Sequence, residues 1–372
     1  MRVVLLVRSL DVGGAETQLV ALAIGLRKEF ETAVVTFYPG GPLEARLREA
    51  GVALHCVGKT GRWDLLGFAA RLRRLLRELK PDVLQSFLGP PNLVAAALRP
   101  AAARLVWGLR ASDMDLGRYD WTHRAVFRLE RALSSLPHRI VSNSYAGKAH
   151  VVAAGFPAAK VEVIPNGIDT DRFRPDPAAG RPLRDQWSPA GPLIGMVARL
   201  DPMKDHSTFL RAARILADAR PDARFVCVGG GPADYAASLR QLAASLRLEE
   251  RVLWTGPRSD VLAVYNALDI PTLSSAFGEG FPNAVGEAMA CAKAPVVTDV
   301  GDSARVVAAC GTVVPQGDPA RLAAGWQALL AMGDAARSAL GNSARQRIVS
   351  HFSVAAMVSA TADLYRQIVS QA

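Results

Sequence analysis

The sequence predicts an α/β protein of two Rossmann-like domains, each with a parallel sheet, that face each other across a cleft. Three observations support this fold class. The 372 residues fit two domains of about 150–200 residues. Short apolar runs alternate with helix-like segments, which is typical of a parallel sheet covered by helices. A Pro- and Gly-rich stretch at 174–191 separates two such series and is expected to be a linker.

The elements follow one another in two series. The strand-like runs of the first series are 2–7, 32–36, 53–57, 82–84, 104–107, 139–142 and 161–164. The helix-like segments between them are 17–26, 43–50, 67–80, 92–98, 121–133 and 146–154. The second series has strand-like runs at 193–197, 225–228, 252–254, 267–273, 296–298 and 313–314. We therefore expect domains at 1–173 and 192–352, with a last helix within 353–372.

Composition indicates a soluble chain with an uneven charge. No apolar run approaches 18 residues, and the apolar core of residues 1–8 is too short for a signal sequence. The four cysteines are scattered, so we interpret them as thiols of a reducing cytoplasm. Residues 1–185 hold 27 Lys and Arg against 18 Asp and Glu, and the rest is nearly neutral. A basic half favours a polyanionic or membrane-surface partner.

Five cations of the basic half lie on one amphipathic segment, residues 67–80. They are Arg71, Arg73, Arg74, Arg77 and Lys80. Leucines at helical spacing form the apolar stripe of the same segment. Two interpretations stay open, which are a solvated surface helix and a helix that lies on an anionic membrane leaflet.

Residues 274–302 hold the densest set of candidate functional side chains. An apolar run leads into a glycine-containing loop, a predicted helix at about 282–290 and a second apolar run at 294–300. A helix that starts after such a loop presents backbone amides to an anionic or polar ligand. Glu279 lies in the loop and Glu287 in the helix. We therefore expect a ligand-binding segment here.

The spacing of the two glutamates argues against an acid/base pair acting on one bond. Eight helical residues separate two positions by about 12 Å along the axis. The carboxyls of retaining glycosidases lie about 5 Å apart, and those of inverting glycosidases about 6.5–9.5 Å. We interpret Glu279 and Glu287 as acceptors for different hydroxyls of one polyhydroxylated ligand. The alternative is a solvated helix start with a surface glutamate.

Two cations follow the first strand of the second series. Arg199 and Lys204 flank Pro202, so both can converge on one point beyond the end of the strand. Fixed cations stabilise the charge that develops on a departing diphosphate. Arginine supplies bidentate donors and lysine a compact charge. The alternative is a pair of surface cations beside Asp201 and Asp205.

Two glycine loops follow predicted strands and could place backbone amides against a ligand. Gly13 and Gly14 follow the first strand, but they do not fit the G-x-G-x-x-G spacing. Gly229 and Gly231 follow another strand, and Asp234 occupies the third glycine position. The sequence therefore argues against a dinucleotide-dependent dehydrogenase.

The segment EGFPNAVGEAMACAKAPVVTDVGD resembles the E-x7-E region of the family-4 retaining glycosyltransferases, which have the GT-B fold. Residues 165–169 match the interdomain signature of that family, Arg199 and Lys204 its R-x4-K, and 255–260 its base-edge loop. The resemblance covers nearly the whole chain. It implies that the helix near 354–369 returns to brace the first domain.

The resemblance also implies a set of site residues. Arg199, Lys204 and Glu279 are expected to be catalytic. The residues expected to bind the donor sugar or nucleotide are Gly13, Gly14, Gly231, Arg258, Gly280, Phe281, Pro282, Asn283 and Glu287. The histidines that many relatives carry after two first-domain strands are replaced here, so Arg110 is expected to contact the donor instead. Ala292 replaces a usual glycine, and we expect this to be tolerated because the run stays small.

The expected activity is retaining transfer of a hexose from a UDP-linked nucleotide sugar to a lipid-linked or growing polysaccharide. The resemblance implies a cytoplasmic enzyme of polysaccharide biosynthesis, peripheral at the inner membrane face, with no nucleic-acid partner. No cofactor and no catalytic metal are expected. D-x-D, a metal-diphosphate signature, occurs only at 113–115 and 169–171, away from the expected leaving group.

Two other function classes remain as alternatives. One is a catalytically silent sugar-nucleotide-binding or scaffold protein, against which the presence of Arg199, Lys204, Glu279 and Glu287 argues. Hydrolysis of the donor would distinguish it from an enzyme. The other is a phosphorylase of the same fold, which would need a Schiff-base lysine for pyridoxal phosphate. Lys293 is near the expected site but has no recognisable context for that role.

Overall fold

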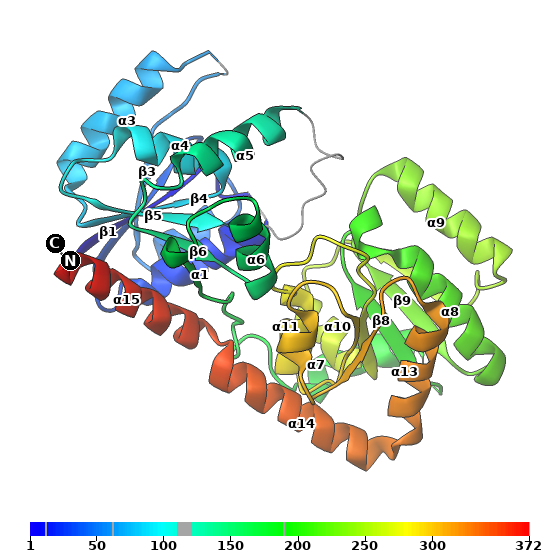
Figure 1. Ribbon diagram of the computed structural model, residues 1–372. Coiled ribbons are helices and arrows are strands. Elements are labelled where there is room, and N and C mark those ends of the chain that lie inside the picture. Colours follow the sequence, from blue (N-terminus) through cyan, green and yellow to red (C-terminus); the bar gives the residue numbers. More distant parts are fainter. Residues whose placement is uncertain (12, 62, 110–120, 189, 372) are drawn as a thin grey trace. The chain divides into compact units, whose positions relative to one another are not determined.

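The computed structural model describes residues 1–11, 13–61, 63–109, 121–188 and 190–371. The chain forms two compact units, of which the first comprises Met1–Gly167 and Val354–Ala372 and the second Ile168–Ser353 (Figure 1). Each unit contains one sheet whose paired strands all run parallel. The predicted α/β fold class with two Rossmann-like domains is therefore confirmed.

The sheet of the first unit has seven strands in the order β3-β2-β1-β4-β5-β6-β7. These are β1 (Arg2–Val7), β2 (Glu31–Thr36), β3 (Ala53–Cys56), β4 (Val83–Phe87), β5 (Arg104–Leu109), β6 (Arg139–Ser142) and β7 (Val161–Val163). The helices are α1 (Gly14–Leu26), α2 (Glu44–Glu49), α3 (Leu66–Leu79), α4 (Gly89–Leu98), α5 (Trp121–Leu133), α6 (Tyr145–Ala153) and α15 (Val354–Ser370).

Strand β1 shows why both faces of this sheet are covered. Val3, Leu5 and Val7 pack into one buried cluster, and Val4 and Leu6 pack into another. Successive side chains of a strand point to opposite faces, so a continuous apolar run requires a hydrophobic layer on each side. The first cluster includes residues of α1 and α15, and the second includes residues of α3. Helix α15 packs against α1 in the first unit (Figure 1).

The sheet of the second unit has six strands in the order β10-β9-β8-β11-β12-β13. These are β8 (Leu193–Val197), β9 (Arg224–Val228), β10 (Val252–Gly256), β11 (Ile270–Leu273), β12 (Val296–Thr298) and β13 (Thr312–Val314). The helices are α7 (Pro177–Trp187), α8 (His206–Ala219), α9 (Ala233–Ser245), α10 (Val261–Ala267), α11 (Asn283–Ala290), α12 (Ser303–Val307), α13 (Pro319–Ala331) and α14 (Gly333–His351).

Two expectations about the chain need correction. The stretch 174–191, expected to be a linker, contains α7, which packs against α10 and contributes Leu183 to the core of the second unit. Its composition misled because Pro177 occupies the first turn of the helix, where proline needs no N–H partner. The apolar run 267–273 was expected to be one strand, but Ala267 ends α10 and the strand begins at Ile270.

The strand order locates the edge at which a ligand can bind. In the second unit the order reverses direction between β8 and β11, which are neighbours in the sheet. Ligands of open parallel sheets bind outside the carboxyl ends of strands at such a switch point. The segment 198–205 follows β8, and the segment 274–282 follows β11. The two strands therefore bring the R-x4-K and the first glutamate to the same edge.

Candidate functional site

A pocket of about 740 Å³ opens at this edge of the second unit. Its lining comes from the segments after β8, β9 and β10 and from α10 and α11. The lining includes six residues whose contacts define the site, namely Arg199, Gly231, Arg258, Tyr265, Asn283 and Glu287. Five of them were predicted from the sequence. Glu279, which was also predicted, does not line this pocket; its carboxylate pairs with Lys204 on the segment after β8.

The glycines after β9 allow two loops to approach at van der Waals distance. A Cβ at Gly229 would lie 2.0 Å from the carbonyl oxygen of Ala198, and one at Gly231 would lie 2.2 Å from that of Leu200. The amide of Leu200 donates to the carbonyl of Gly230 at 2.9 Å. These glycines are therefore required for the wall of the pocket, and only Gly231 was predicted as a site residue.

Lys204 is fixed by the fold and is not a free surface cation. It ends a short 3-10 turn, Pro202–Lys204, that Asp201 caps by accepting from the amide of Met203 at 2.9 Å. Its ammonium group forms an ion pair with Glu279. Arg199 is different, because its side chain is 73% exposed and its nearest carboxylate, Asp201, lies 3.6 Å away. The two cations of the motif thus have different environments.

Glu279 is a buried carboxylate held by several contacts. The hydroxyl of Ser275 donates to its Oε1 at 2.5 Å, beside the Lys204 ammonium group. The carbonyl of Ser275 in turn accepts from the hydroxyl of Thr298 at 2.7 Å. A Cβ at Gly301 would lie 2.1 Å from the carbonyl oxygen of Glu279, so the loop also packs closely against the segment after β12. Ser275 was missed in the sequence because its spacing from Glu279 has no recognisable pattern.

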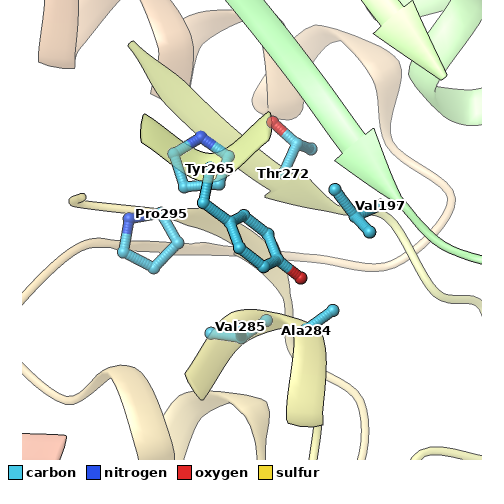
Figure 2. A pocket seen from close by; sticks show the side chains of 7 residues that line it. Val197, Tyr265, Thr272, Ala284, Val285 and Pro295 are labelled. Atoms are coloured by element: carbon cyan, nitrogen blue, oxygen red, sulfur yellow. The ribbon is translucent and has the colours of Figure 1, made fainter. Parts of the chain in front are cut away.

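Glu287 lies on α11, is partly buried and lines the pocket. The hydroxyl of Tyr265 donates to Glu287 Oε2 at 2.9 Å. Burial raises the pKa of the Glu287 carboxyl to about 7, although the Tyr265 hydrogen bond and the positive charge of Arg172 act in the opposite direction. Figure 2 shows the Tyr265 ring among Pro295, Val197, Ala284 and Val285, around a small cavity.

The other predicted residues of the segment 280–283 differ in what they contact. Asn283 lines the pocket at the first position of α11. Pro282 precedes it, and its carbonyl accepts from the amides of Val285 and Gly286. The side chain of Phe281 is 5% exposed and packs against Phe352 with ring centroids 5.4 Å apart, so this side chain belongs to the core. The carbonyl of Gly280 is held by the amide of Asp302 at 3.1 Å.

Arg258 lies at the far wall of the pocket, after β10. Its guanidinium group forms a bidentate pair with Asp260, at 2.7 and 2.5 Å, and lies over the ring of Trp187 at 5.5 Å. The hydrogen bond to Asp260 raises the pKa of Arg258 and lowers that of Asp260. These contacts hold the side chain in place and leave nearby backbone groups as candidates to contact a ligand.

The first-unit part of the predicted site is only partly described. Gly13 caps α1, Gly14 begins it, and a Cβ at Gly13 would lie 2.2 Å from a carboxylate oxygen of Glu16. Arg110 and the pair Asp113 and Asp115 lie outside the described residues. Of the two positions where histidines are absent, only the one in β4 is described at its polar side chains, Gln85 and Ser86.

Gln85 and Ser86 show what occupies that position. Gln85 accepts from the hydroxyl of Tyr365, which ties β4 to α15. Ser86 donates to Asn92 at 2.7 Å, and Asn92 donates to the buried Glu130 at 2.8 Å. Gln85 and Ser86 thus each have a hydrogen-bond partner within the first unit.

Three further expectations concern a metal ion, Lys293 and a membrane span. Among the residues that the structure describes, no group of three or more His, Cys, Asp or Glu could hold a metal ion. Lys293 donates to the carbonyl of Asn266 at 3.0 Å, and its pKa is lowered by burial. No helix in the described part of the chain is long and apolar enough to cross a bilayer.

Comparison with known proteins gives consistent matches to glycosyltransferases. A family model described as Glycosyltransferase Family 4 matches residues 12–172, and one described as Glycosyl transferases group 1 matches residues 191–332. The two models match consecutive parts of the chain and support a family-4 glycosyltransferase. The E-x7-E resemblance and the roles of its two glutamates remain predictions.

Individual relatives agree with this family. The chain is 38% identical over 128 residues to a GDP-mannose-dependent alpha-(1-6)-phosphatidylinositol monomannoside mannosyltransferase of Mycobacterium tuberculosis, which covers 34% of this chain and 32% of the relative. It is 29% identical over 271 residues to a 2-deoxystreptamine glucosyltransferase of Streptomyces kanamyceticus, 68% of each chain. The match thus spans about a third of the length of the mannosyltransferase.

Solved structures share the fold of the whole chain. A structure of Anabaena HepE in complex with UDP has a TM-score of 0.85 at 23% identity and covers 99% of this chain and 100% of its own. Sucrose-phosphate synthase from Thermosynechococcus elongatus has a TM-score of 0.80 at 20% identity, with complete coverage of both chains. These likenesses establish the two-domain GT-B fold.

Proposed function

We propose that this chain, whose consecutive halves match glycosyltransferase models, is a nucleotide-sugar-dependent glycosyltransferase that retains the configuration of the transferred sugar. The observation that carries the proposal is the arrangement at one edge of the second sheet. There Glu287 and the glycines after β9 line one pocket. The ion pair of Lys204 and Glu279 joins the segments that follow the neighbouring strands β8 and β11. A donor with a ribose, a diphosphate and a sugar has the groups to match these features.

The proposed roles follow from the environment of each residue. Glu287 reaches the pocket with an acceptor group and binds the ribose hydroxyls. Arg199, exposed at the pocket wall, and Lys204 bind the diphosphate and stabilise the charge that develops as it leaves. Glu279 accepts from hydroxyls of the transferred sugar. The amides near Asn283, at the start of α11, face the same ligand.

The reaction needs no base from the protein in this proposal. A bond forms between an acceptor hydroxyl oxygen and the anomeric carbon, while the bond from that carbon to the diphosphate oxygen breaks. The acceptor proton passes to the departing diphosphate on the same face. The protein's part is to orient both substrates and to neutralise the diphosphate with Arg199 and Lys204 in place of a metal ion.

The donor is proposed to be UDP-linked and the acceptor a lipid-linked or growing polysaccharide. The complex of the structurally similar HepE with UDP supports a uridine donor, and the phosphatidylinositol mannoside named for the mycobacterial relative supports a lipid acceptor. That relative uses GDP-mannose, so guanosine donors belong in the test. The first unit is proposed to hold the acceptor.

The membrane surface is the proposed location of the acceptor. Helix α3 has two buried leucines, Leu72 and Leu76, and presents exposed arginines on its other side. Just before and at its start, Trp63 is 85% exposed, Leu65 59% and Leu66 88%. A basic helix with an exposed aromatic and apolar end fits an anionic leaflet. We propose that the enzyme is peripheral at the cytoplasmic face of a membrane.

A panel of nucleotide sugars tests the function directly. Thermal unfolding with UDP- and GDP-linked hexoses should show one donor class that stabilises the chain, because a ligand at 100 times its Kd adds about 2.7 kcal/mol. Slow donor hydrolysis, or transfer to an added lipid-linked acceptor, should follow with the same donor. Stabilisation without any turnover on any acceptor tested would instead indicate a sugar-nucleotide-binding protein, and absence of both would contradict the proposal.

A further inference from the structure

We propose that Tyr265 is a positioning residue for nucleotide binding, which orients the Glu287 carboxylate. The inference rests on the proposed role of Glu287 at the ribose. Tyr265 comes from α10 and Glu287 from α11, 22 positions later, and the Tyr265 hydroxyl donates to Glu287 Oε2 at 2.9 Å. Tyr265 therefore acts on the ligand through Glu287.

The phenol is held so that its hydroxyl has little freedom. Tyr265 is 1% exposed, and its ring makes an edge contact with Phe173, with centroids 6.0 Å apart. Figure 2 shows the ring enclosed by Pro295, Val197 and the start of α11. A tyrosine has only two side-chain torsions, so a ring packed on several sides fixes the position of its hydroxyl. The hydroxyl can thus serve as a fixed donor for the carboxylate.

The hydrogen bond from Tyr265 occupies one oxygen of Glu287 and leaves acceptor sites for a ligand. Oε2 accepts from Tyr265, while the residue as a whole lines the pocket. A carboxylate has about four acceptor sites on its two oxygens, which is enough for one phenol and two vicinal hydroxyls of a ribose. With Oε2 anchored, fewer orientations of the carboxylate plane are available. A ribose that docks in the pocket then meets acceptors already in place, so less ordering entropy is lost on binding.

The ionisation state of Glu287 sets the number of acceptors. Burial favours the neutral acid, with a pKa of about 7, and the Tyr265 hydrogen bond favours the charged form. Two other ionisable groups face the carboxyl. Arg172, on the segment between β7 and α7, favours its ionisation, and the Cys291 thiol, directly after the end of α11, is kept neutral because burial raises its pKa to about 12. A protonated Glu287 would turn one acceptor oxygen into a donor.

Calorimetry of the full chain with UDP, and with GDP, tests this from pH 5.5 to 9. Tyr265→Phe keeps the ring and removes the hydroxyl. We expect it to weaken nucleotide affinity about 10–100-fold at pH 7, as for loss of a hydrogen bond to a charged group. The midpoint of the rise in affinity with pH should also move to higher pH. A merely structural loss would lower affinity at every pH without moving that midpoint.

Two further variants separate the possible failures. Glu287→Gln, measured with the same nucleotide, subtracts the titration of the ligand's own phosphate and should lack the rise due to Glu287. Tyr38→Phe, a hydroxyl deletion in the first unit, should bind as the parent does. If Glu287→Gln weakens binding while Tyr265→Phe keeps the parent's affinity and midpoint, the positioning role is wrong and the proposed function survives. If Glu287→Gln binds as tightly as the parent, the ribose role itself fails.

Discussion

Lys204 and Glu279 form an ion pair between two loops that lie 75 positions apart in the sequence. Their side chains are 16% and 6% exposed. The pair exists because β8 and β11, which precede the two loops, are neighbours at the point where the strand order reverses. A diphosphate that binds Lys204 therefore meets an ammonium group already paired with the buried Glu279, whereas the exposed Arg199 lies 3.6 Å from Asp201.

The two cations should respond differently to deletion. Arg199→Ala should lower turnover about 10²–10³-fold with little change in the free energy of unfolding, because Arg199 is exposed. Lys204→Ala should lower turnover comparably and also destabilise the fold by about 3–5 kcal/mol, since it leaves Glu279 buried without its cation. Steady-state kinetics with denaturation curves make the comparison. Adding Glu279→Gln to Lys204→Ala should restore much of the stability, and no restoration would show that the pair is not the cause.

Chelation tests the proposal that cationic side chains replace a metal ion. Activity measured in EDTA should equal that of the untreated enzyme, because Arg199 and Lys204 neutralise the diphosphate in the proposed mechanism. The assay should be repeated after extended dialysis against the chelator. Loss of activity that Mg²⁺ or Mn²⁺ restores would overturn this part of the proposal.

The two glutamates should affect different parts of the donor. Glu287→Gln should weaken binding of free nucleoside diphosphate and of the full donor alike, because an unsatisfied buried group costs about 1–3 kcal/mol. Glu279→Gln should leave nucleoside diphosphate affinity near that of the parent and cut sugar transfer. Calorimetry with the bare nucleotide and turnover on the full donor measure the two effects. Equal loss of bare nucleotide in both variants would contradict the division of roles.

The fold could be predicted from the sequence because the alternation of apolar runs is a local pattern, and so could five residues that line one pocket. The apolar alternation predicted both parallel sheets, and Arg199, Gly231, Arg258, Asn283 and Glu287 line one pocket as expected. Arg199, Gly231 and Arg258 lie shortly after strands, and Asn283 and Glu287 lie on α11, so the neighbouring residues reveal their places.

The contacts that support those residues were not predictable from the sequence. Tyr265 and Ser275 act through single hydrogen bonds whose geometry depends on how α10 and the loop after β11 pack. Ala292 was expected to be tolerated for its size, but it has a φ of 57°, so the usual glycine there meets a backbone requirement. Packing and backbone torsion, rather than residue pattern, decide these features.

Membrane binding should have an electrostatic and an apolar component that can be removed separately. Arg73→Glu with Arg74→Glu should weaken co-sedimentation with anionic vesicles, each cation near the surface contributing about 1 kcal/mol. Added salt should weaken binding of the parent in the same way. Trp63→Ser with Leu66→Ser should weaken binding at both low and high salt, because these side chains are exposed and apolar.

A charge reversal elsewhere controls for the change in net charge. Arg211→Glu with Arg321→Glu alters two exposed arginines of the second unit by the same amount. That variant should sediment with anionic vesicles as the parent does. If it loses binding as strongly as the α3 variant, net charge rather than α3 attracts the vesicle, and if neither loses binding, α3 is a solvated surface helix.

Glu130 should make the stability of the first unit depend on pH. It is 5% exposed on α5, and burial raises its pKa from 4.5 to about 7, against the effect of the Asn92 hydrogen bond. Because the folded-state pKa is raised, the folded chain binds the proton more tightly than the unfolded chain. The favourable contribution is complete below about pH 4.5 and is lost as pH rises to about 7, by roughly 3 kcal/mol.

Glu130→Gln isolates that contribution, since the amide oxygen can still accept from Asn92. In denaturation experiments at pH 5, the variant and the parent should have similar free energies of unfolding. At pH 8, the variant should be more stable than the parent. Glu249→Gln, at an exposed position, should leave the difference between the two pH values unchanged. Glu287 titrates with the same sign, but it is present in both chains and cancels in the comparison. A Glu130→Gln chain that loses as much stability as the parent between pH 5 and pH 8 would show that Glu130 does not titrate in this range.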